Sequence, residues 1–386
     1  MNLSLELMLQ LCIIMPLLAT FAIVATGRYP NLRESVTLLT CVVLIFLVVT
    51  LYQGLSSGKS ISVYWWELLP GLTISFDIEP LGMLFALVAS FLWLVTTCYS
   101  IGYMRSHQEK NQTRFYVCFA VAIGAVMGLA FSANLFTLFI FYEVLTLSTY
   151  PLVTHAGTEK AKKGGRIYLG ILLTTSIVFF LLAIVSTWLV AGTLDFKPGG
   201  IFADDVDKIT ASILLVLFIF GIGKAAIMPF HRWLPAAMVA PTPVSSLLHA
   251  VAVVKAGVFT VLKVCTFIFG LDLLAQLPST QFLLYLAGFS VLIASIIAMR
   301  QDNLKARLAY STVSQLGYIT IGALLATSSG VIGSAMHIAM HAFGKITLFF
   351  CAGAILVAAH KSKISEMHGL GRQMPFTMTA FFIATL

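Results

Sequence analysis

The sequence has very few charged residues, and this scarcity excludes the folds of most soluble proteins. Charged residues make up 10% of its 386 positions and hydrophobic residues 59%, whereas soluble domains contain about 25% and about 45–50%. The mean hydropathy is +0.98. In lipid, backbone groups find hydrogen-bond partners only within helices or closed barrels. Because the alternating polar positions of a barrel strand are absent, we predict an all-α fold, a polytopic bundle of transmembrane helices.

The sequence also lacks the cysteine spacings that are typical of redox and metal centres. Its six cysteines are widely separated, with no CxxC or CxxCH motif among them. They are Cys12, Cys41, Cys98, Cys118, Cys265 and Cys351. Disulfides, iron–sulfur clusters and c-type haem are therefore unsupported. We predict that the chain binds no cofactor of its own.

Apolar windows of about 20 residues divide the chain into consecutive predicted spans. They cover residues 5–26, 34–54, 78–103, 115–132, 133–153, 167–191, 209–228, 243–266, 279–299, 306–327 and 330–358, and a further span begins near Pro375. No basic leader precedes the first apolar run, which is about as long as a spanning helix. We therefore interpret it as a span and not as a signal peptide.

The basic residues of the loops predict the orientation, because cytoplasmic loops carry an excess of lysine and arginine. With the N-terminus outside, the cytoplasmic loops hold Arg28, Arg33, Arg105, Lys110, Arg114, Lys160, Lys162, Lys163, Arg166, Arg232, Arg300, Lys305, Arg307, Lys361, Lys363 and Arg372. The outer loops hold only Lys59, Lys197 and Lys208, beside acidic residues such as Asp204, Asp205 and Asp207. We predict a multi-pass protein of a bacterial plasma membrane with its N-terminus outside. The net charge of +8 is divided among short loops and predicts no nucleic-acid partner.

One acidic residue, Glu143, lies in the middle of a span, in LFTLFIFYEVLTLSTYPLV. A charge at that depth costs about 2.5–3.5 kcal/mol on insertion scales, so the carboxylate should face the bundle interior and a cationic or polar partner. Lys224, in LFIFGIGKAAIMPFHRWLP, is the natural partner. The two residues are either a structural ion pair that fixes the packing or part of a proton pathway. Intramembrane ionisable groups favour the pathway.

The segment around Lys224 is predicted to be a broken helix. Gly221 and Gly223 precede the lysine, and Pro229 and Pro235 follow it. Proline removes an amide donor and clashes with the preceding turn. Non-helical backbone at membrane depth is tolerated only where it lines a cavity or is buried in protein. Interrupted helices beside charges are common at transport sites.

The next span, PVSSLLHAVAVVKAGVFTVLKV, contributes His249, Lys255 and Lys263. The two lysines share a helix face about two turns apart. Lys255 lies deep in the span and is predicted to carry protons. Lys263 lies near the outer end, where its long stem could instead carry the ammonium group to the membrane surface. Both interpretations stay open for Lys263.

Three titratable residues recur at four-residue intervals in AMHIAMHAFGKITLFFCAG: His337, His341 and Lys345. This spacing places them along one stripe of a helix, and histidine exchanges protons near neutral pH. The HxxxH spacing also allows zinc or haem, but no HExxH signature is present and Lys345 would repel a cation. A hydrogen-bonded core histidine explains either histidine alone. The ladder of all three favours proton relay.

Four stretches of this sequence resemble the antiporter-like subunits shared by Mrp-type cation/proton antiporters, respiratory complex I (NADH:quinone oxidoreductase) and related membrane hydrogenases. The stretches are FYEVLTLSTYPLV, GIGKAAIMPFHRWLPAAMVAPTPVSSLLHAVAVVKAGVF, LKARLAYSTVSQLGYI and MHIAMHAFGKITLFFCAG. The resemblance extends over nearly the whole chain.

The resemblance implies a bundle of about fourteen helices with two inverted repeats, each with a broken helix, and a hydrophilic axis across the middle of the membrane. It implies N-terminal helices in residues 1–112, a first repeat in 113–266 and a second repeat in 267–386. It assigns Glu143 and Lys224 to the first half-channel, His249 and Lys255 to the continuing axis, and His337, His341 and Lys345 to the connection with the second half.

The sequence departs from the family pattern near its end. The second broken helix usually carries a further lysine or glutamate, but MPFTMTAFFIATL stops before that position. We therefore expect an antiporter-like plan truncated after about 11–12 spans, with an incomplete second half-channel.

Three functions agree with these residues. The stretch APTPVSSLLHAVAVVKAGVF is closer to the Mrp-type members of the family and favours monovalent cation (Na+)/H+ antiport. The alternative is a proton-pumping subunit of an NADH:quinone oxidoreductase or a membrane hydrogenase. Redox chemistry would then belong to other subunits, because no NADH, flavin, quinone or iron–sulfur motif is present. The third is a scaffold whose charges serve assembly. The predicted partners are other membrane subunits, the ions H+ and Na+, and the bilayer.

Overall fold

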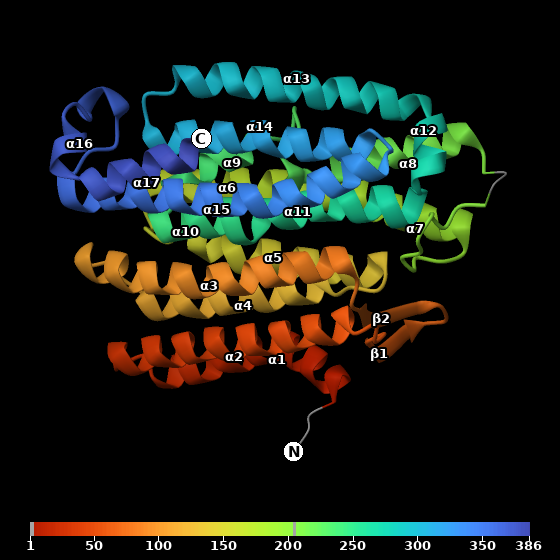
Figure 1. The fold of residues 1–386 in the computed structure, drawn as a ribbon, viewed down its shortest axis with the longest axis horizontal. Coiled ribbons are helices and arrows are strands. Elements are labelled where there is room, and N and C mark those ends of the chain that lie inside the picture. The colour runs from red at the N-terminus through yellow and green to blue at the C-terminus, as the bar shows by residue number, and fades with distance from the viewer. Residues whose placement is uncertain (1–3, 204–205) are drawn as a thin grey trace.

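Long apolar helices lie side by side along the whole molecule in the computed structural model, which describes residues 4–203 and 206–386. Nine helices within these residues are long and apolar enough to cross a membrane. Figure 1 shows α1 and α2 at one edge of the bundle and α13 at the other edge. The predicted fold class, a polytopic helical bundle, is confirmed.

The N-terminal half contains five long helices and a β-hairpin. These elements are α1 (Leu5–Ala25), α2 (Pro30–Ser56), β1 (Ser62–Leu69), β2 (Leu72–Asp77), α3 (Pro80–Ser106), α4 (Gln112–Ala130) and α5 (Leu135–Val153). A long helix follows, formed by α6 (Glu159–Thr174), the π-helical turn η1 (Thr175–Phe180) and α7 (Leu181–Ala191).

The next elements are short and irregular. They are α8 (Lys208–Gly221), the 3-10 turn η2 (Gly223–Ala225), α9 (Trp233–Ala236), the 3-10 turn η3 (Ala237–Val239), α10 (Thr242–Ser246), the π-helical turn η4 (Leu247–Val251), α11 (Val253–Lys263), the π-helical turn η5 (Val264–Phe269) and α12 (Leu271–Gln276).

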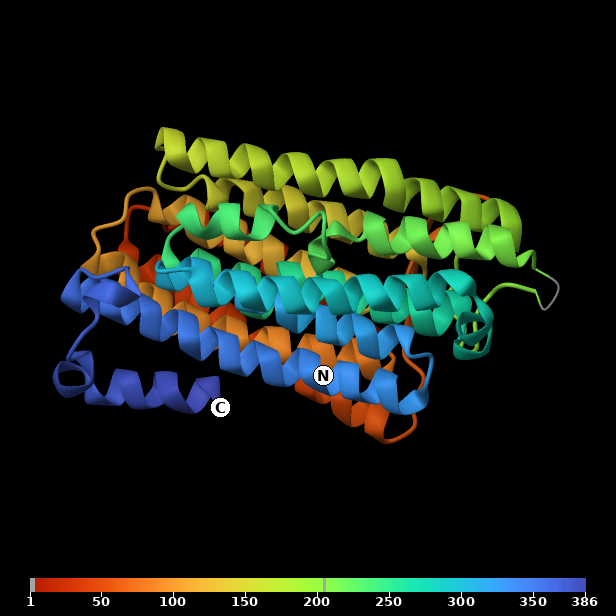
Figure 2. The ribbon, with the colours of Figure 1, turned by 90° about the horizontal axis from the view of Figure 1, so that it is seen from above.

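The last elements are mostly long again. They are α13 (Pro278–Arg300), α14 (Leu304–Leu324), α15 (Ser328–Ala359), the 3-10 turn η6 (Ile364–Glu366), α16 (Leu370–Gln373) and α17 (Pro375–Thr385). Figure 2 shows α17 beside only part of the length of α15.

The observed helices follow the predicted spans closely, with two differences. The span predicted for 209–228 ends as a helix at Gly221, because the chain becomes irregular before the first proline. The hairpin of β1 and β2 lies in a stretch that the sequence analysis left between spans. Asp204 and Asp205, assigned above to an outer loop, lie outside the described residues.

The β-hairpin covers one end of the bundle. Its two strands pair antiparallel around a two-residue turn, in which Gly71 has a φ of +82° that favours glycine. The hairpin is attached to the α4–α5 connection by two backbone hydrogen bonds: the Asp77 amide donates to the Phe131 carbonyl at 2.8 Å, and the Ala133 amide donates to the Ser75 carbonyl at 3.0 Å. We call this end of the bundle the hairpin end, and the other, where α16 lies, the α16 end (Figure 1).

The helix α11 is enclosed by protein on every side. All of its residues from Val253 to Lys263 are buried. A helix that is apolar around its whole circumference is expected in the centre of a bundle, because no face of it needs to meet water. Consequently Lys255 and Lys263 lie inside the protein.

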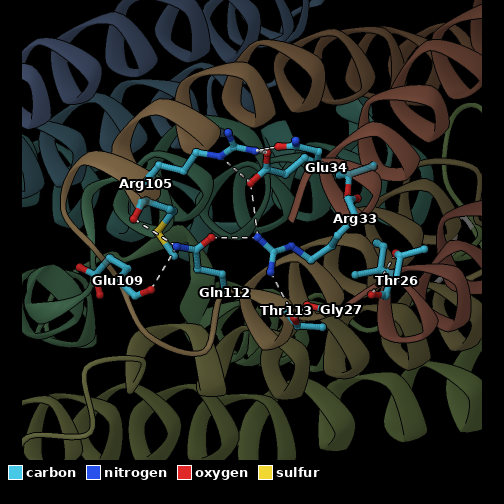
Figure 3. Close-up of polar contacts among 12 residues, drawn as sticks. Thr26, Gly27, Arg33, Glu34, Arg105, Glu109, Gln112 and Thr113 are labelled. Atoms are coloured by element: carbon cyan, nitrogen blue, oxygen red, sulfur yellow. Dashed lines mark hydrogen bonds and ion pairs between the residues drawn. The ribbon is translucent and has the colours of Figure 1, made fainter. Parts of the chain in front are cut away.

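A buried polar cluster fastens the first helices together at the α16 end (Figure 3). The carboxylate of Glu34 lies between two guanidinium groups, accepting a hydrogen bond from Arg33 at 3.3 Å and one from Arg105 Nε at 3.2 Å. Arg33 also donates to Gln112 Oε1 at 2.8 Å and to Thr113 Oγ1 at 3.2 Å. The cluster therefore connects α2 to the end of α3 and the start of α4.

Replacing Glu34 by glutamine is expected to destabilise the protein by about 3 kcal/mol or more, because removing one partner of a buried ion pair leaves the other charge uncompensated. Thermal unfolding of the detergent-solubilised protein measures this change. The control is Glu159→Gln, because Glu159 forms only an exposed ion pair with Lys162, and its loss should change stability little. Equal stability of the two variants would contradict a stabilising role for the cluster.

Candidate functional site

The predicted interruption around Lys224 is present, and side chains satisfy the backbone that it frees. After α8 ends at Gly221, the chain makes the turn η2, and Pro229 lies in the irregular segment before α9, which contains Pro235. The Trp233 indole donates to the Gly223 carbonyl at 3.0 Å, and the Met228 amide donates to Ser290 Oγ at 3.2 Å. These bonds replace helical ones, as non-helical backbone away from water requires.

A glycine on α11 allows η2 to approach that helix. A Cβ atom on Gly257 would lie 2.3 Å from the carbonyl carbon of Lys224 and 2.3 Å from the amide nitrogen of Ala225. No real Cβ atom tolerates such distances from backbone atoms. The interrupted segment is therefore held against α11 at closer range than any residue with a side chain would permit.

Lys224 is completely buried, and its ammonium group is bound by a neighbour of Glu143. It donates to the Tyr142 carbonyl at 2.5 Å and lies 3.1 Å from the centroid of the Tyr142 ring. The Lys224 amide donates to Tyr142 Oη at 3.2 Å. Tyr142 thus contacts the backbone and the charge of the same lysine.

The predicted ion pair between Glu143 and Lys224 is not formed in this structure, which is a correction to the sequence analysis. Among the described residues, neither carboxylate oxygen of Glu143 has a hydrogen-bond partner, although both are buried. Successive residues of a helix point about 100° apart. Because Tyr142 faces η2, the side chain of Glu143 is turned aside. The two charges lie on neighbouring elements without direct contact.

The structure brings the two predicted groups of basic residues together at Lys255. Its ammonium group contacts Nδ1 of His341, so that α11 meets α15 through two buried titratable side chains. The rings of His341 and His337 stack with centroids 6.1 Å apart. His249, in η4, is also buried, and neither of its ring nitrogens has a hydrogen-bond partner among the described residues.

The helix α14 supplies polar partners that the sequence analysis missed. Gln315 Oε1 lies 2.7 Å from His337 Nε2, and Lys345 donates to Ser311 Oγ at 2.8 Å. Ser311 and Gln315 are four residues apart and so lie on one face of the helix. That spacing, in LKARLAYSTVSQLGYI, was the available signal.

The stripe of His337, His341 and Lys345 lines a groove of about 1200 Å³ between α14, α15 and α17. The groove is mixed in character, because Met340 and Phe381 also line it. These titratable groups therefore adjoin open space.

Lys263 lies apart from the other lysines, at the hairpin end. Its ammonium group forms an ion pair with Glu79 at 2.7 Å and donates to the Ser132 carbonyl at 3.1 Å. The lysine side chain is 2% exposed. The alternative that its stem carries the charge to the membrane surface is therefore wrong, because the ammonium group stays inside and finds its counter-charge there.

A second polar group lies at the α16 end. His107 Nδ1 is 3.0 Å from Glu109 Oε1, and Nε2 of the buried His155 is 3.9 Å from Glu109 Oε2. Burial lowers the pKa of His155, and the nearby Glu109 opposes that effect. The connecting loops thus hold titratable groups at this face of the bundle.

Comparison with known proteins gives consistent matches. The family described as "NADH:quinone oxidoreductase/Mrp antiporter, TM" matches residues 132–386. The family described as "NADH-Ubiquinone oxidoreductase (complex I), chain 5 N-terminus" matches residues 69–116.

Among individual relatives, NADH-quinone oxidoreductase subunit N of Desulforudis audaxviator is 30% identical over 97% of this chain and 75% of its own length. NAD(P)H-quinone oxidoreductase subunit 5 from the chloroplast of Nymphaea alba is 29% identical over 90% of this chain. The chain spans only 48% of the length of that relative.

Two solved structures share the fold. A chain of the membrane-bound sulfane sulfur reductase, an archaeal respiratory membrane complex, has a TM-score of 0.86 and 25% identity, covering 97% of this chain and 77% of its own. A chain of the Mrp complex from Dietzia sp. has a TM-score of 0.87 and 23% identity, covering 99% and 70%.

The broken helix and the buried charges on several helices define a multi-span membrane protein of the antiporter-like class. The chain belongs to the family of membrane subunits shared by NADH:quinone oxidoreductases and Mrp antiporters.

Replacing Gly257 by alanine should push η2 away from α11 and displace Lys224. Overpacking of this kind costs about 1–3 kcal/mol, so we expect a lower unfolding temperature of the detergent-solubilised protein. The matched control is Gly288→Ala, because a Cβ atom there meets open space. If Gly257→Ala unfolds at the same temperature as Gly288→Ala, the close approach is not required.

Proposed function

We propose that this chain is a proton-translocating, antiporter-like subunit of a multi-subunit membrane complex. The proposed pathway consists of Glu143, Lys224, His249, Lys255, Lys263, His337, His341 and Lys345. The observation that carries the proposal is the contact between Lys255 and His341, which joins two helices through two buried titratable groups. Such groups are costly inside a membrane and are generally found at ion pathways.

Proton exchange between Lys255 and His341 requires only a small rearrangement. A proton on the lysine nitrogen is donated to Nδ1 of the imidazole, which leaves a neutral amine and an imidazolium. His337, stacked on His341 and hydrogen-bonded to Gln315, is the next group along the groove. The proposed direction leads from the centre of the bundle along α15.

The Tyr142 carbonyl offers a way to couple this transfer to Lys224. In the present arrangement the lysine binds that carbonyl, while the carboxylate of Glu143 on the next residue has no hydrogen-bond partner among the described residues. A second arrangement, in which Lys224 pairs with Glu143, would change the field along α11. Two unit charges about 4 Å apart interact by about 4 kcal/mol at an effective dielectric constant of 20. A change of this pairing is therefore large enough to drive a proton transfer.

The proposed assembly is an Mrp-type monovalent cation (Na+)/H+ antiporter, with other Mrp membrane subunits as partners. The stretch APTPVSSLLHAVAVVKAGVF and the shared fold with the Mrp chain support this choice. The second candidate is a proton-pumping subunit of an NADH:quinone oxidoreductase, which the 30% identical relative favours. Redox centres would then belong to partner subunits.

The placement in the membrane is part of the same proposal. The basic loops lie at the α16 end, so we place that end in the cytoplasm of a bacterium and the hairpin end outside. The proposed internal divisions are residues 1–112, the first repeat in 113–266 and the second in 267–386.

Replacing Lys224 by alanine in the intact assembly should lower proton flux by about tenfold or more, because it removes a charge that the pathway needs. Lys224→Met keeps the length of the side chain and separates loss of charge from loss of packing. Flux is measured in membrane vesicles with a pH-sensitive dye, at equal subunit abundance. Lys160→Ala, at an exposed position of α6, is the control.

Driving these vesicles with a sodium gradient and with NADH separates the two assemblies. Flux that depends on Lys224 under sodium supports the antiporter, and flux that depends on it under NADH supports the redox complex. Unchanged flux in both Lys224 variants under both conditions would contradict the pathway and leave a scaffold role.

A further inference from the structure

The hairpin end contains a buried ion pair that continues the line of Lys255. On α11, Lys255, Phe259 and Lys263 are spaced at four-residue intervals, so their side chains follow one stripe of the helix. Lys263 is about 12 Å along the axis from Lys255. The stripe leads from the centre of the bundle toward the hairpin.

Lys263 meets the surface only through Glu79. The lysine side chain is 2% exposed, whereas that of Glu79, its partner at 2.7 Å, is 14% exposed. Glu79 immediately precedes α3, beneath the hairpin. Asp77, at the end of β2, is the other acidic group whose field reaches Lys263. The carboxylate of Glu79 is thus the place where this buried line approaches solvent.

Two phenylalanine rings separate the ion pair from Lys255. Phe259 packs against Phe85 of α3 with ring centroids 5.0 Å apart, and both side chains are buried. The ammonium group of Lys263 lies 5.9 Å from the Phe259 ring centroid, on the hairpin side of the ring. Apolar constrictions of this kind gate ion movement because water leaves them. In the present arrangement no polar side chain of this stripe bridges the interval.

We propose that Glu79 and Lys263 form the proton-exchange site of the pathway at the hairpin end, and that Phe85 and Phe259 form the barrier that separates this site from Lys255. This inference rests on the proposed function, and it adds a carboxylate and a gate that the sequence analysis did not identify.

Each step of the proposed transfer conserves protons. In the closed state Lys263 is an ammonium and Glu79 a carboxylate. When the rings part and water enters, Lys255 releases one proton through that water to Glu79 and becomes a neutral amine. The protonated Glu79 no longer attracts Lys263, so the pair opens. Glu79 then releases its proton to the solvent at the hairpin end, and the ion pair re-forms.

A purely structural ion pair is the alternative, and a double variant distinguishes the two. Glu79→Gln or Lys263→Gln alone leaves a buried charge without its partner, which is destabilising in either case. The combination Glu79→Gln/Lys263→Gln removes both charges together. A structural pair predicts that flux recovers in the double variant, whereas an exchange site predicts that flux stays low because the carboxylate is still missing.

The experiment uses the assembled complex in membrane vesicles, with proton flux followed by a pH-sensitive dye. We expect the Glu79→Gln variant and the double variant to retain about one tenth of wild-type flux or less. The acid control is Asp272→Asn, an exposed position of α12. Flux that returns to the wild-type level in the double variant would overturn the proposal.

The barrier is tested in the same vesicles without a driving reaction. Phe259→Ala should open a wettable gap and raise the passive proton leak several-fold, roughly as loss of a dewetted constriction predicts. Phe282→Ala, at an exposed position of α13, is the matched control. A leak equal to that of the control would overturn the barrier.

Lys255→Met, measured in parallel, distinguishes the two levels of the account. If this variant loses flux while the Glu79 and Phe259 variants behave like their controls, only the present inference fails. If Lys255→Met keeps wild-type flux, the proposed function fails, and the inference fails with it.

Discussion

The enclosure of α11 by protein on every side is the constraint on which the rest of the site depends. A lysine in contact with lipid would move its ammonium group to the membrane surface, whereas Lys255 has no such route because every residue of α11 is buried. Its charge must therefore meet other side chains inside the bundle. The structure supplies His341 for Lys255 and Glu79 for Lys263.

The broken helix follows from the same enclosure. Backbone groups that leave a helix inside a membrane need partners, and α11 and its neighbours provide the space and the donors. Gly257 lets η2 reach α11, while Trp233 and Ser290 occupy two of the freed backbone groups. Lys224 is consequently held at a fixed position beside α5, close to Glu143 without pairing with it.

Much of the fold was predictable from sequence, because span length and hydropathy are set by the thickness of the bilayer. The helices from α1 to α5 begin and end within a few residues of the predicted spans. The hairpin was missed since Tyr64 and Trp66 are exposed and lie in a segment too short to span. Hydropathy carries no information about such a surface element.

The identities of the titratable residues were also readable from sequence, but their partners were not. Spacing along one helix shows that His337, His341 and Lys345 share a stripe, yet it does not show which stripe of another helix faces them. The contact of Lys255 with His341 and the pair of Lys263 with Glu79 depend on how α11, α15 and α3 pack. The direct pairing expected of Glu143 is absent from the described residues because Tyr142 occupies the facing position.

The most direct test of the central claim is a double-mutant cycle on proton flux with Lys255→Met and His341→Met in the assembled complex. If both residues serve one pathway, the double variant should retain the same residual flux as the more impaired single variant, since a pathway already interrupted cannot be interrupted again. Independent, multiplicative losses would contradict the claim that the contact between Lys255 and His341 transfers protons.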